Sequence, residues 1–308
     1  MKLSAPLILS FVVISMLGYM GILRHSSTIT QKEAPLTSLK RSFPEVELTA
    51  RAAIVYDPIT QKVLYDKEAD LPLPLASLTK IMTAIVAVEQ YGNNSPKSFA
   101  DAQGQHTWTL ITFLEKMLVS SSNYAAQAVT ALANDTYDSN RWSGESIFVE
   151  AMNATADTLG LRNTLYLNTS GLDIDDTTAG AYGTARETAT LLWYGASSQP
   201  EIFRATSNAI VNLKSREGAL TDTENTNIIV ERLPAVLASK TGFTDLAGGN
   251  LAIITDAGIN HPIVIVVMGS GEAERFSDVE RLSRATLQYF ASDIGDLSKA
   301  VDSKDKTR

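Results

Sequence analysis

The order of its predicted elements constrains the fold of this chain more than any other sequence feature. Ala52–Tyr56 and Lys62–Asp66 are short strand-like runs, and Asp57-Pro58 between them predicts a hairpin. Strand-like runs return near the other end of the chain, at Leu237–Thr241, Asn250–Thr255 and Pro262–Met268. This order predicts an α/β (α+β) fold, in which both ends of the chain build one antiparallel sheet flanked by helices, with a helical insertion subdomain between them.

Helical spacing of apolar residues recurs through the rest of the chain. Ser77–Tyr91 predicts a helix stopped by Gly92, and this helix is apolar nearly all round, which is typical of a buried helix. The other predicted helices are a segment with apolar positions Leu110, Phe113, Leu114, Met117 and Leu118, then Asn123–Ala133, Phe148–Leu159, Thr184–Tyr194 and Glu274–Phe290. From Asp293 onward we expect a charged and frayed tail.

The N-terminal segment carries a run of 19 uncharged residues, Ala5–Leu23. As a helix this run would be about 28 Å long, close to the thickness of a bilayer's hydrocarbon core. It is longer than the apolar part of a secretory signal, and no small-x-small cleavage site precedes Arg24. We therefore expect a retained membrane anchor, with a cleaved signal peptide as the alternative.

The remaining boundaries follow from composition. Residues 1–24 form the anchor or signal segment, and the polar residues 25–47 form a tether. Residues 48–292 form one compact domain, and residues 293–308 form the charged tail.

Composition excludes several classes of site. The 308 residues contain no cysteine, which excludes disulfides, a thiolate nucleophile and cysteine-bound zinc. There are three histidines and no His-Glu-x-x-His motif, and we expect neither a metal nor a cofactor. The formal net charge is −8 and the compact region has no basic cluster, which disfavours nucleic-acid binding.

Ser77 and Lys80 lie three positions apart in the predicted buried helix, so they share one face of it. Burial disfavours the ammonium form of a lysine, and a neutral amine beside a serine can remove the hydroxyl proton. The alternative is a serine cap followed by a lysine that reaches the surface. The same spacing recurs at Ser303 and Lys306 in the charged tail, so spacing alone does not identify a nucleophile.

Two more polar motifs follow Ser77-x-x-Lys80 along the chain. Ser121-Ser122-Asn123 separates two predicted helices, where serine and asparagine can also be simple cap residues. Lys240-Thr241-Gly242 ends a predicted strand, where a cation, a hydroxyl donor and an open backbone can lie along one edge. The alternative for this motif is an ordinary surface strand end.

In this order the three motifs resemble those of the serine D-alanyl-D-alanine carboxypeptidases, the low-molecular-mass penicillin-binding proteins. Further similar stretches are Pro74–Thr83, Met152-Asn153, Leu159–Leu161, Asn163-Thr164, Ser170–Asp173, Asn225–Asn227, Lys240–Thr244 and Ala247-Gly248. The resemblance implies a β-lactamase/transpeptidase-like fold over roughly Ala52–Phe290. The interval from Ser77 to Ser121 is short for the family, so we expect a trimmed hairpin or helix at the cleft.

The resemblance implies a role for each residue of the first two motifs. Ser77 would attack the carbonyl of the penultimate D-alanine and form an acyl-enzyme, and Lys80 would be the base that activates it. Ser121 would relay a proton toward the leaving amine. Asn123 would hold the substrate amide.

It also implies roles for the third motif. Lys240 would supply positive potential, and Thr241 would bind the terminal carboxylate of the substrate. Gly242 would keep the backbone open to the ligand. The backbone N–H groups of Ser77 and Phe243 would form the oxyanion hole.

The implied partners are peptidoglycan stem peptides as substrates, β-lactams as inhibitors, and the membrane through the N-terminal segment. The implied location is the bacterial cell envelope, at the extracytoplasmic face of the cytoplasmic membrane or exported. Two alternatives stay open: a β-lactamase-like hydrolase and a non-catalytic sensor of muropeptides or β-lactams. Ser122 and the missing Glu-x-x-x-Asn frame at Glu145 and Glu150 disfavour the first, and the intact motif residues disfavour the second.

Overall fold

The computed structural model describes residues 42–130, 144–258 and 260–305. The predicted anchor Ala5–Leu23 and the end of the predicted helix Asn123–Ala133 lie outside the described residues. Among the helices of these three ranges, none combines the length and the apolar character needed to cross a bilayer.

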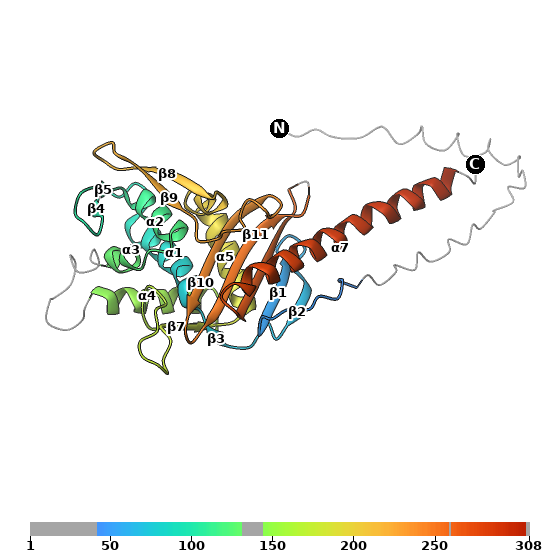
Figure 1. Cartoon of the computed structure of the whole chain (residues 1–308), viewed down its shortest axis with the longest axis horizontal. Coiled ribbons are helices and arrows are strands. Elements are labelled where there is room, and N and C mark those ends of the chain that lie inside the picture. The colour runs from blue at the N-terminus through green and yellow to red at the C-terminus, as the bar shows by residue number, and fades with distance from the viewer. Residues whose placement is uncertain (1–41, 131–143, 259, 306–308) are drawn as a thin grey trace, which may run out of the picture. The chain divides into compact units, whose positions relative to one another are not determined.

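A five-stranded antiparallel sheet forms the centre of the fold, with the strand order β10-β11-β12-β1-β2 (Figure 1). Its strands are β10 Val236–Thr244, β11 Gly248–Asp256, β12 Pro262–Ser270, β1 Ala52–Asp57 and β2 Lys62–Lys67. β1 pairs with β12, so that Ile54 lies opposite Val266. The prediction that both ends of the chain build one antiparallel sheet is therefore confirmed.

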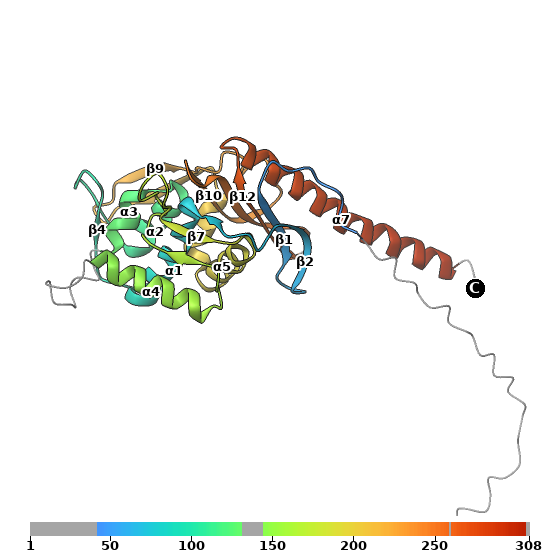
Figure 2. The ribbon, with the colours of Figure 1, turned by 90° about the horizontal axis from the view of Figure 1, so that it is seen from below.

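Alternate side chains of this sheet face two separate cores. Ile254 and Val266 point into a core shared with the helices, whereas Ile253 and Ile265 point toward the C-terminal helix α7, Glu274–Asp305. Both faces are thus covered, as Figure 2 shows from below. This explains why β11 and β12 are buried at almost every position rather than at every second one.

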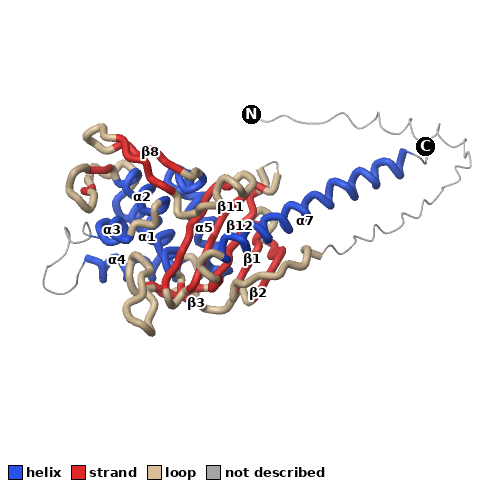
Figure 3. Tube along the Cα trace, viewed as in Figure 1, coloured by secondary structure: helices blue, strands red, loops and turns tan. Residues whose placement is uncertain are grey.

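The helical part comprises six helices and several short strands among the described residues (Figure 3). The helices are α1 Thr79–Tyr91, α2 Leu110–Val119, α3 Asn123–Ala128, α4 Gly144–Thr158, α5 Ala185–Ser198 and α6 Pro200–Arg204. The 3₁₀ turns are η1 Ala76–Leu78 and η3 Ala205–Ser207. The small sheets are β3 Leu73–Pro74 with β7 Ala181–Gly183 and β6 Leu165–Tyr166, β4 Phe99–Ala100 with β5 Thr107–Trp108, and β8 Ile210–Lys214 with β9 Leu220–Glu224.

α6 and all of the short strands were not predicted from the sequence. Strands of two or three residues are too short to show a period, and β8 and β9 are largely exposed on both sides of the hairpin. The family comparison had suggested a trimmed element between Ser77 and Ser121, and the structure has the short β4–β5 hairpin in this interval.

The C-terminal helix α7 is longer than predicted. It was expected to end at Phe290 and to be followed by a frayed tail from Asp293, but the backbone is helical as far as Asp305. The expectation of fraying was wrong because the stretch contains no proline and a single glycine, Gly295, and charged residues on their own do not end a helix. Midway along α7, Tyr289 contacts Phe43, whose ring is tilted against those of Tyr65 and Tyr289, with ring centroids 5.6 and 5.8 Å away.

Candidate active site

Ser77 lies in the 3₁₀ turn η1, immediately before α1, and Lys80 lies in the first turn of α1. The Lys80 Nζ and Ser77 Oγ atoms are 2.8 Å apart. The predicted helix began at Ser77, but the α-helix begins at Thr79 because Ala76 has the left-handed φ of 48° and interrupts the backbone there. The predicted burial of this helix is confirmed, since every residue from Thr79 to Val88 is buried.

The Lys80 amine has three polar neighbours. Besides Ser77 Oγ, Nζ contacts the Asn123 Oδ1 atom at 2.8 Å and the Ser170 carbonyl oxygen at 2.7 Å. These two oxygens can only accept hydrogen bonds, so a neutral amine donates both of its hydrogens to them and points its lone pair at the Ser77 hydroxyl. Burial lowers the pKa of Lys80 to about 7, which makes this neutral form accessible near neutral pH.

Ser121-Ser122-Asn123 forms the break between α2 and α3, as predicted. Ser122 caps α3 by accepting a hydrogen bond from the Ala125 N–H, so the middle residue has a structural role. Ser121 has the left-handed φ of 56°, and its Oγ atom lies 2.8 Å from Lys240 Nζ. The first and third residues of the motif thus contact the lysines of the other two motifs.

Lys240, Thr241 and Gly242 lie in β10, the edge strand of the central sheet. Lys240 is buried, and burial together with the positive charges of Lys80 and Arg275 lowers its pKa well below the ordinary lysine value. The Thr241 hydroxyl shares a 2.6 Å hydrogen bond with the Thr226 hydroxyl.

Gly242 is where β10 meets the nucleophile segment. A Cβ atom on Gly242 would lie 3.0 Å from the Leu75 carbonyl oxygen and 3.2 Å from the Ser77 nitrogen. A side chain at this position would push η1 away from the strand by a few tenths of an ångström, so glycine favours the close approach. Together these contacts bring all three motifs to one site.

Comparison with known proteins identifies the family. The family model described as D-alanyl-D-alanine carboxypeptidase matches residues 38–100 and 88–272. This chain belongs to that family. A D-alanyl-D-alanine endopeptidase from Pseudomonas aeruginosa is 28% identical over 252 residues, which cover 77% of this chain and 77% of the relative. A D-alanyl-D-alanine carboxypeptidase from Bacillus subtilis is 28% identical over 262 residues, which cover 80% of this chain and 64% of the relative.

A solved structure of the family has the same fold. A penicillin-binding protein from Listeria monocytogenes in its ampicillin-bound form superposes with a TM-score of 0.66 at 28% identity, over 79% of this chain and 99% of that one. The resemblance drawn from the three motifs, and the fold class that it implied, are both confirmed.

Three polar groups that lie at this site in the structure were not predicted from the sequence. The Ser170 carbonyl and the Thr226 hydroxyl lie in Ser170–Asp173 and Asn225–Asn227, which carried the family resemblance without an assigned role. The third is Arg275, at the start of α7, which no sequence signal distinguished from other charged helix residues.

Arg275 adds a third basic side chain to the site. Its side chain is buried, its Nη1 donates to the Gly242 carbonyl oxygen at 3.4 Å, and its guanidinium carbon lies 5.9 Å from the Phe243 ring centroid. Burial lowers the pKa of Arg275, and its Nε atom has no hydrogen-bond partner in the part of the chain that the structure describes. Within the described residues, neither Lys80, Lys240 nor Arg275 forms an ion pair with a carboxylate.

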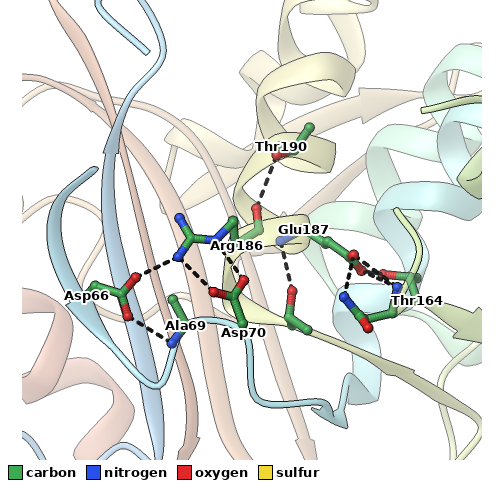
Figure 4. Close-up of polar contacts among 9 residues, drawn as sticks. Asp66, Ala69, Asp70, Thr164, Arg186, Glu187 and Thr190 are labelled. Carbon is green, nitrogen blue, oxygen red and sulfur yellow. Dashed lines mark hydrogen bonds and ion pairs between the residues drawn. The ribbon is translucent and has the colours of Figure 1, made fainter. Parts of the chain in front are cut away.

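The segment between β2 and η1, which precedes Ser77, contacts the first turn of α5 (Figure 4). The Arg186 guanidinium forms ion pairs with Asp66 at 2.6 Å and with Asp70 at 2.7 Å, and the Arg186 N–H donates to the Ala69 carbonyl oxygen. Further along, the Leu75 N–H donates to the carbonyl oxygen of Ala181 in β7. The segment between β2 and η1 is thus held against α5 and β7 on its way to the nucleophile.

Proposed function

We propose that this chain is a serine-type D-alanyl-D-alanine carboxypeptidase, which cleaves peptidoglycan stem peptides through a Ser77 acyl-enzyme and is inhibited by β-lactams. The observation that carries the proposal is the 2.8 Å contact between Ser77 Oγ and a buried Lys80 amine whose other two neighbours are acceptors. This arrangement supplies a hydroxyl nucleophile with a neutral base at its proton.

In the acylation step, Lys80 Nζ takes the hydroxyl proton while Ser77 Oγ attacks the carbonyl carbon of the scissile amide. The backbone N–H groups of Ser77 and Phe243 are the proposed donors to the oxyanion. Asn123 holds the substrate through its amide hydrogens, because its Oδ1 atom already accepts from Lys80.

Collapse of the tetrahedral intermediate breaks the C–N bond and requires a proton on the leaving amine. Ser121, whose Oγ lies 2.8 Å from Lys240 Nζ, is suited to relay to this amine the proton that Lys80 took from Ser77. Lys80, neutral again, then takes a proton from the water that attacks the Ser77 ester and returns it to Ser77 Oγ as the ester bond breaks, and the second product is the shortened peptide with a new carboxylate.

The charge distribution supports a substrate that carries a carboxylate next to the scissile bond. Lys240 and Arg275 are buried basic side chains without a carboxylate partner among the described residues, and Thr241 offers a hydroxyl beside them. A substrate carboxylate would supply the missing negative charge and accept charge-assisted hydrogen bonds.

An endopeptidase is the second candidate, favoured by the Pseudomonas aeruginosa relative. A cross-linked peptide whose leaving amine bears a carboxylate on the same carbon would use the same cations. The two activities are distinguished by giving the purified protein a D-alanyl-D-alanine peptide and a cross-linked dimer, and by measuring free D-alanine against monomer release. Faster cleavage of the dimer would replace the carboxypeptidase assignment.

The decisive experiment for the serine acyl-enzyme is covalent labelling by a fluorescent penicillin. We expect Ser77→Ala to abolish labelling, while Ser303→Ala, at the other serine with the same spacing to a lysine, labels like the wild type. Labelling without either D-alanine release or cleavage of the cross-linked dimer would indicate a sensor instead. Rapid turnover of the penicillin would indicate a β-lactamase-like hydrolase.

For the whole chain, we propose the organisation that its composition suggests. Residues 1–24 anchor the protein in the cytoplasmic membrane, residues 25–47 tether it, and residues 48–292 form the carboxypeptidase domain, followed by the charged residues 293–308. The domain would then work at the extracytoplasmic face, within the cell envelope, where peptidoglycan is found.

A further inference from the structure

A fully buried amide lies directly behind the nucleophile segment. Asn250, in β11, is 0% exposed. Its Nδ2 atom donates to the carbonyl oxygens of Pro74 at 3.0 Å and Leu75 at 3.1 Å, and its Oδ1 atom accepts from the Gly269 N–H at 2.9 Å. Carbonyls only accept and an N–H only donates, so these partners fix the orientation of the amide and use both of its hydrogens.

Asn250 is also the cross-strand partner of Gly242. The two residues hold the same segment in different ways, since Gly242 gives it room on β10 and Asn250 supplies hydrogen bonds from β11. The register between β11 and β12 shifts between Gly249 and Leu251, so that Asn250 sits at an irregularity of the ladder. Such bulges re-aim a side chain and are frequent next to active sites.

The segment that Asn250 holds is strained. Ala76 has a φ of 48°, a left-handed conformation that is unfavourable for a non-glycine residue. The Thr79 hydroxyl donates to the Ala76 carbonyl oxygen at 2.7 Å. Strained residues persist only where their surroundings over-determine them, and Asn250 fixes the two carbonyls that precede Ala76.

We propose that Asn250 is a positioning residue for the nucleophile. By fixing the carbonyls of Pro74 and Leu75 it keeps Ala76 in its left-handed conformation and Ser77 Oγ at 2.8 Å from Lys80 Nζ. It acts through this segment and does not contact the substrate. The inference rests on the proposed function, because it takes Ser77 to be the serine that is acylated.

The test uses Asn250→Asp, which keeps the shape of the side chain but replaces its two donor hydrogens by an acceptor. Penicillin acylation is measured over a range of concentrations, which separates the pre-acylation dissociation constant from the limiting acylation rate constant. We expect the rate constant to fall by about 10–100-fold, the scale of a nucleophile misplaced by about 1 Å, and the dissociation constant to stay within about threefold. Asn250→Ala, which adds no charge, should behave like Asn250→Asp: its limiting rate constant should fall and its dissociation constant should stay nearly unchanged.

Asn153→Asp is the matched control, because Asn153 in α4 has the same bonding pattern away from the nucleophile. Its Nδ2 atom donates to the carbonyl oxygens of Val149 and Tyr166, and its Oδ1 atom accepts from the Tyr166 N–H. We expect this variant to melt at a lower temperature, while its limiting acylation rate constant, measured below melting, equals that of the wild type.

Two results would overturn the positioning role. The first is that an Asn250 variant, shown by thermal melting to be folded, has the same limiting acylation rate constant as the wild type. The other is an equal loss in Asn153→Asp, which would reduce the effect to general destabilisation. Failure of the proposed function looks different, because the wild type itself would then not be acylated or Ser77→Ala would still be labelled, and the positioning role would fall with it.

Discussion

At the scale of single residues, the reactivity proposed for Ser77 depends on the protonation state of Lys80. An ordinary lysine has a pKa of about 10.4 and would be almost wholly protonated at neutral pH. Burial lowers the pKa of Lys80 to about 7, and its two acceptor neighbours leave the lone pair of the neutral amine facing the hydroxyl. The base therefore depends on the surroundings of the amine as much as on the lysine itself.

This predicts a pH dependence of acylation. Below pH 7 the Lys80 amine carries a proton and cannot accept another, so the penicillin acylation rate should rise with pH and reach half of its maximum near pH 7. The measurement is the second-order acylation rate constant between pH 5 and pH 9. A rate that is flat over this range, or that rises only near pH 10, would contradict the neutral-base role.

The same burial predicts how stability varies with pH. Between about pH 7 and the ordinary lysine pKa, the unfolded chain holds a proton on Lys80 that the folded protein does not hold. The contribution of this group to the free energy of unfolding should therefore increase as pH rises through that window. Urea unfolding of the wild type and of Lys80→Met at pH 7 and pH 9 checks the sign, since only the wild type should gain this contribution.

Replacing Lys80 by arginine should separate charge from basicity. The guanidinium group stays protonated in proteins, so Lys80→Arg keeps a cation but removes the base, and we expect acylation to fall by roughly a thousandfold or more. Lys240→Arg should have a milder effect, because the role proposed for Lys240 needs only its charge. Stopped-flow labelling of both variants measures this. Near wild-type acylation by Lys80→Arg would make Lys80 a structural cation.

At the scale of elements, the site depends on how closely η1 and the loop after β6 approach each other. Gly171, in this loop, has a φ of 79°, and a Cβ atom there would lie 1.8 Å from the Ala76 carbonyl oxygen. The same loop supplies the Ser170 carbonyl oxygen that contacts Lys80. One glycine thus lets the loop reach both the base and the strained residue before the nucleophile.

Gly171→Ala and Gly160→Ala should therefore differ in stability although their backbones are alike. Gly160 has a φ of 73° with no atom within 4 Å of a Cβ position, so its substitution should cost only the left-handed strain, about 1–2 kcal/mol. Gly171→Ala adds a backbone clash and should cost about 2 kcal/mol more. Urea unfolding of both variants makes the comparison, and equal losses would show that the approach of the loop is not tight.

At the scale of the whole molecule, the two ends of the domain are joined by one buried carboxylate. Asp278 of α7 accepts hydrogen bonds from the Thr49 and Ala50 N–H groups and from the Ser270 hydroxyl. Thr49 and Ala50 precede β1, Ser270 ends β12 and Asp278 lies in the first turns of α7. Contacts between distant parts of the sequence therefore hold together the sheet that carries β10.

The proposed anchor is tested at this scale as well. If Ala5–Leu23 spans the membrane, the protein from expressing cells should stay in the membrane fraction after a high-salt wash and dissolve only in detergent. A variant that lacks residues 1–24 is the control and should be released. A mature form with a new N-terminus near residue 25 would instead support a cleaved signal peptide.

Local pattern in the sequence was enough to predict several features of the fold and the site. The central strands, the buried helix after Ser77 and the break at Ser121–Asn123 follow from apolar spacing and from residues that end helices, and all of them are present in the structure. The three motifs were sufficient to indicate the family because each places particular functional groups at a fixed spacing.

How these groups meet depends on long-range packing, which local pattern does not show. The contact of Lys80 with Asn123 and that of Lys240 with Ser121 join residues far apart in the sequence, and no local pattern encodes such distances. Arg275 and Asn250 carried no signal, because a helical arginine and a strand asparagine gain their roles from the groups packed against them. The lowered pKa of Lys80 has the same origin, since burial is set by the folded chain as a whole.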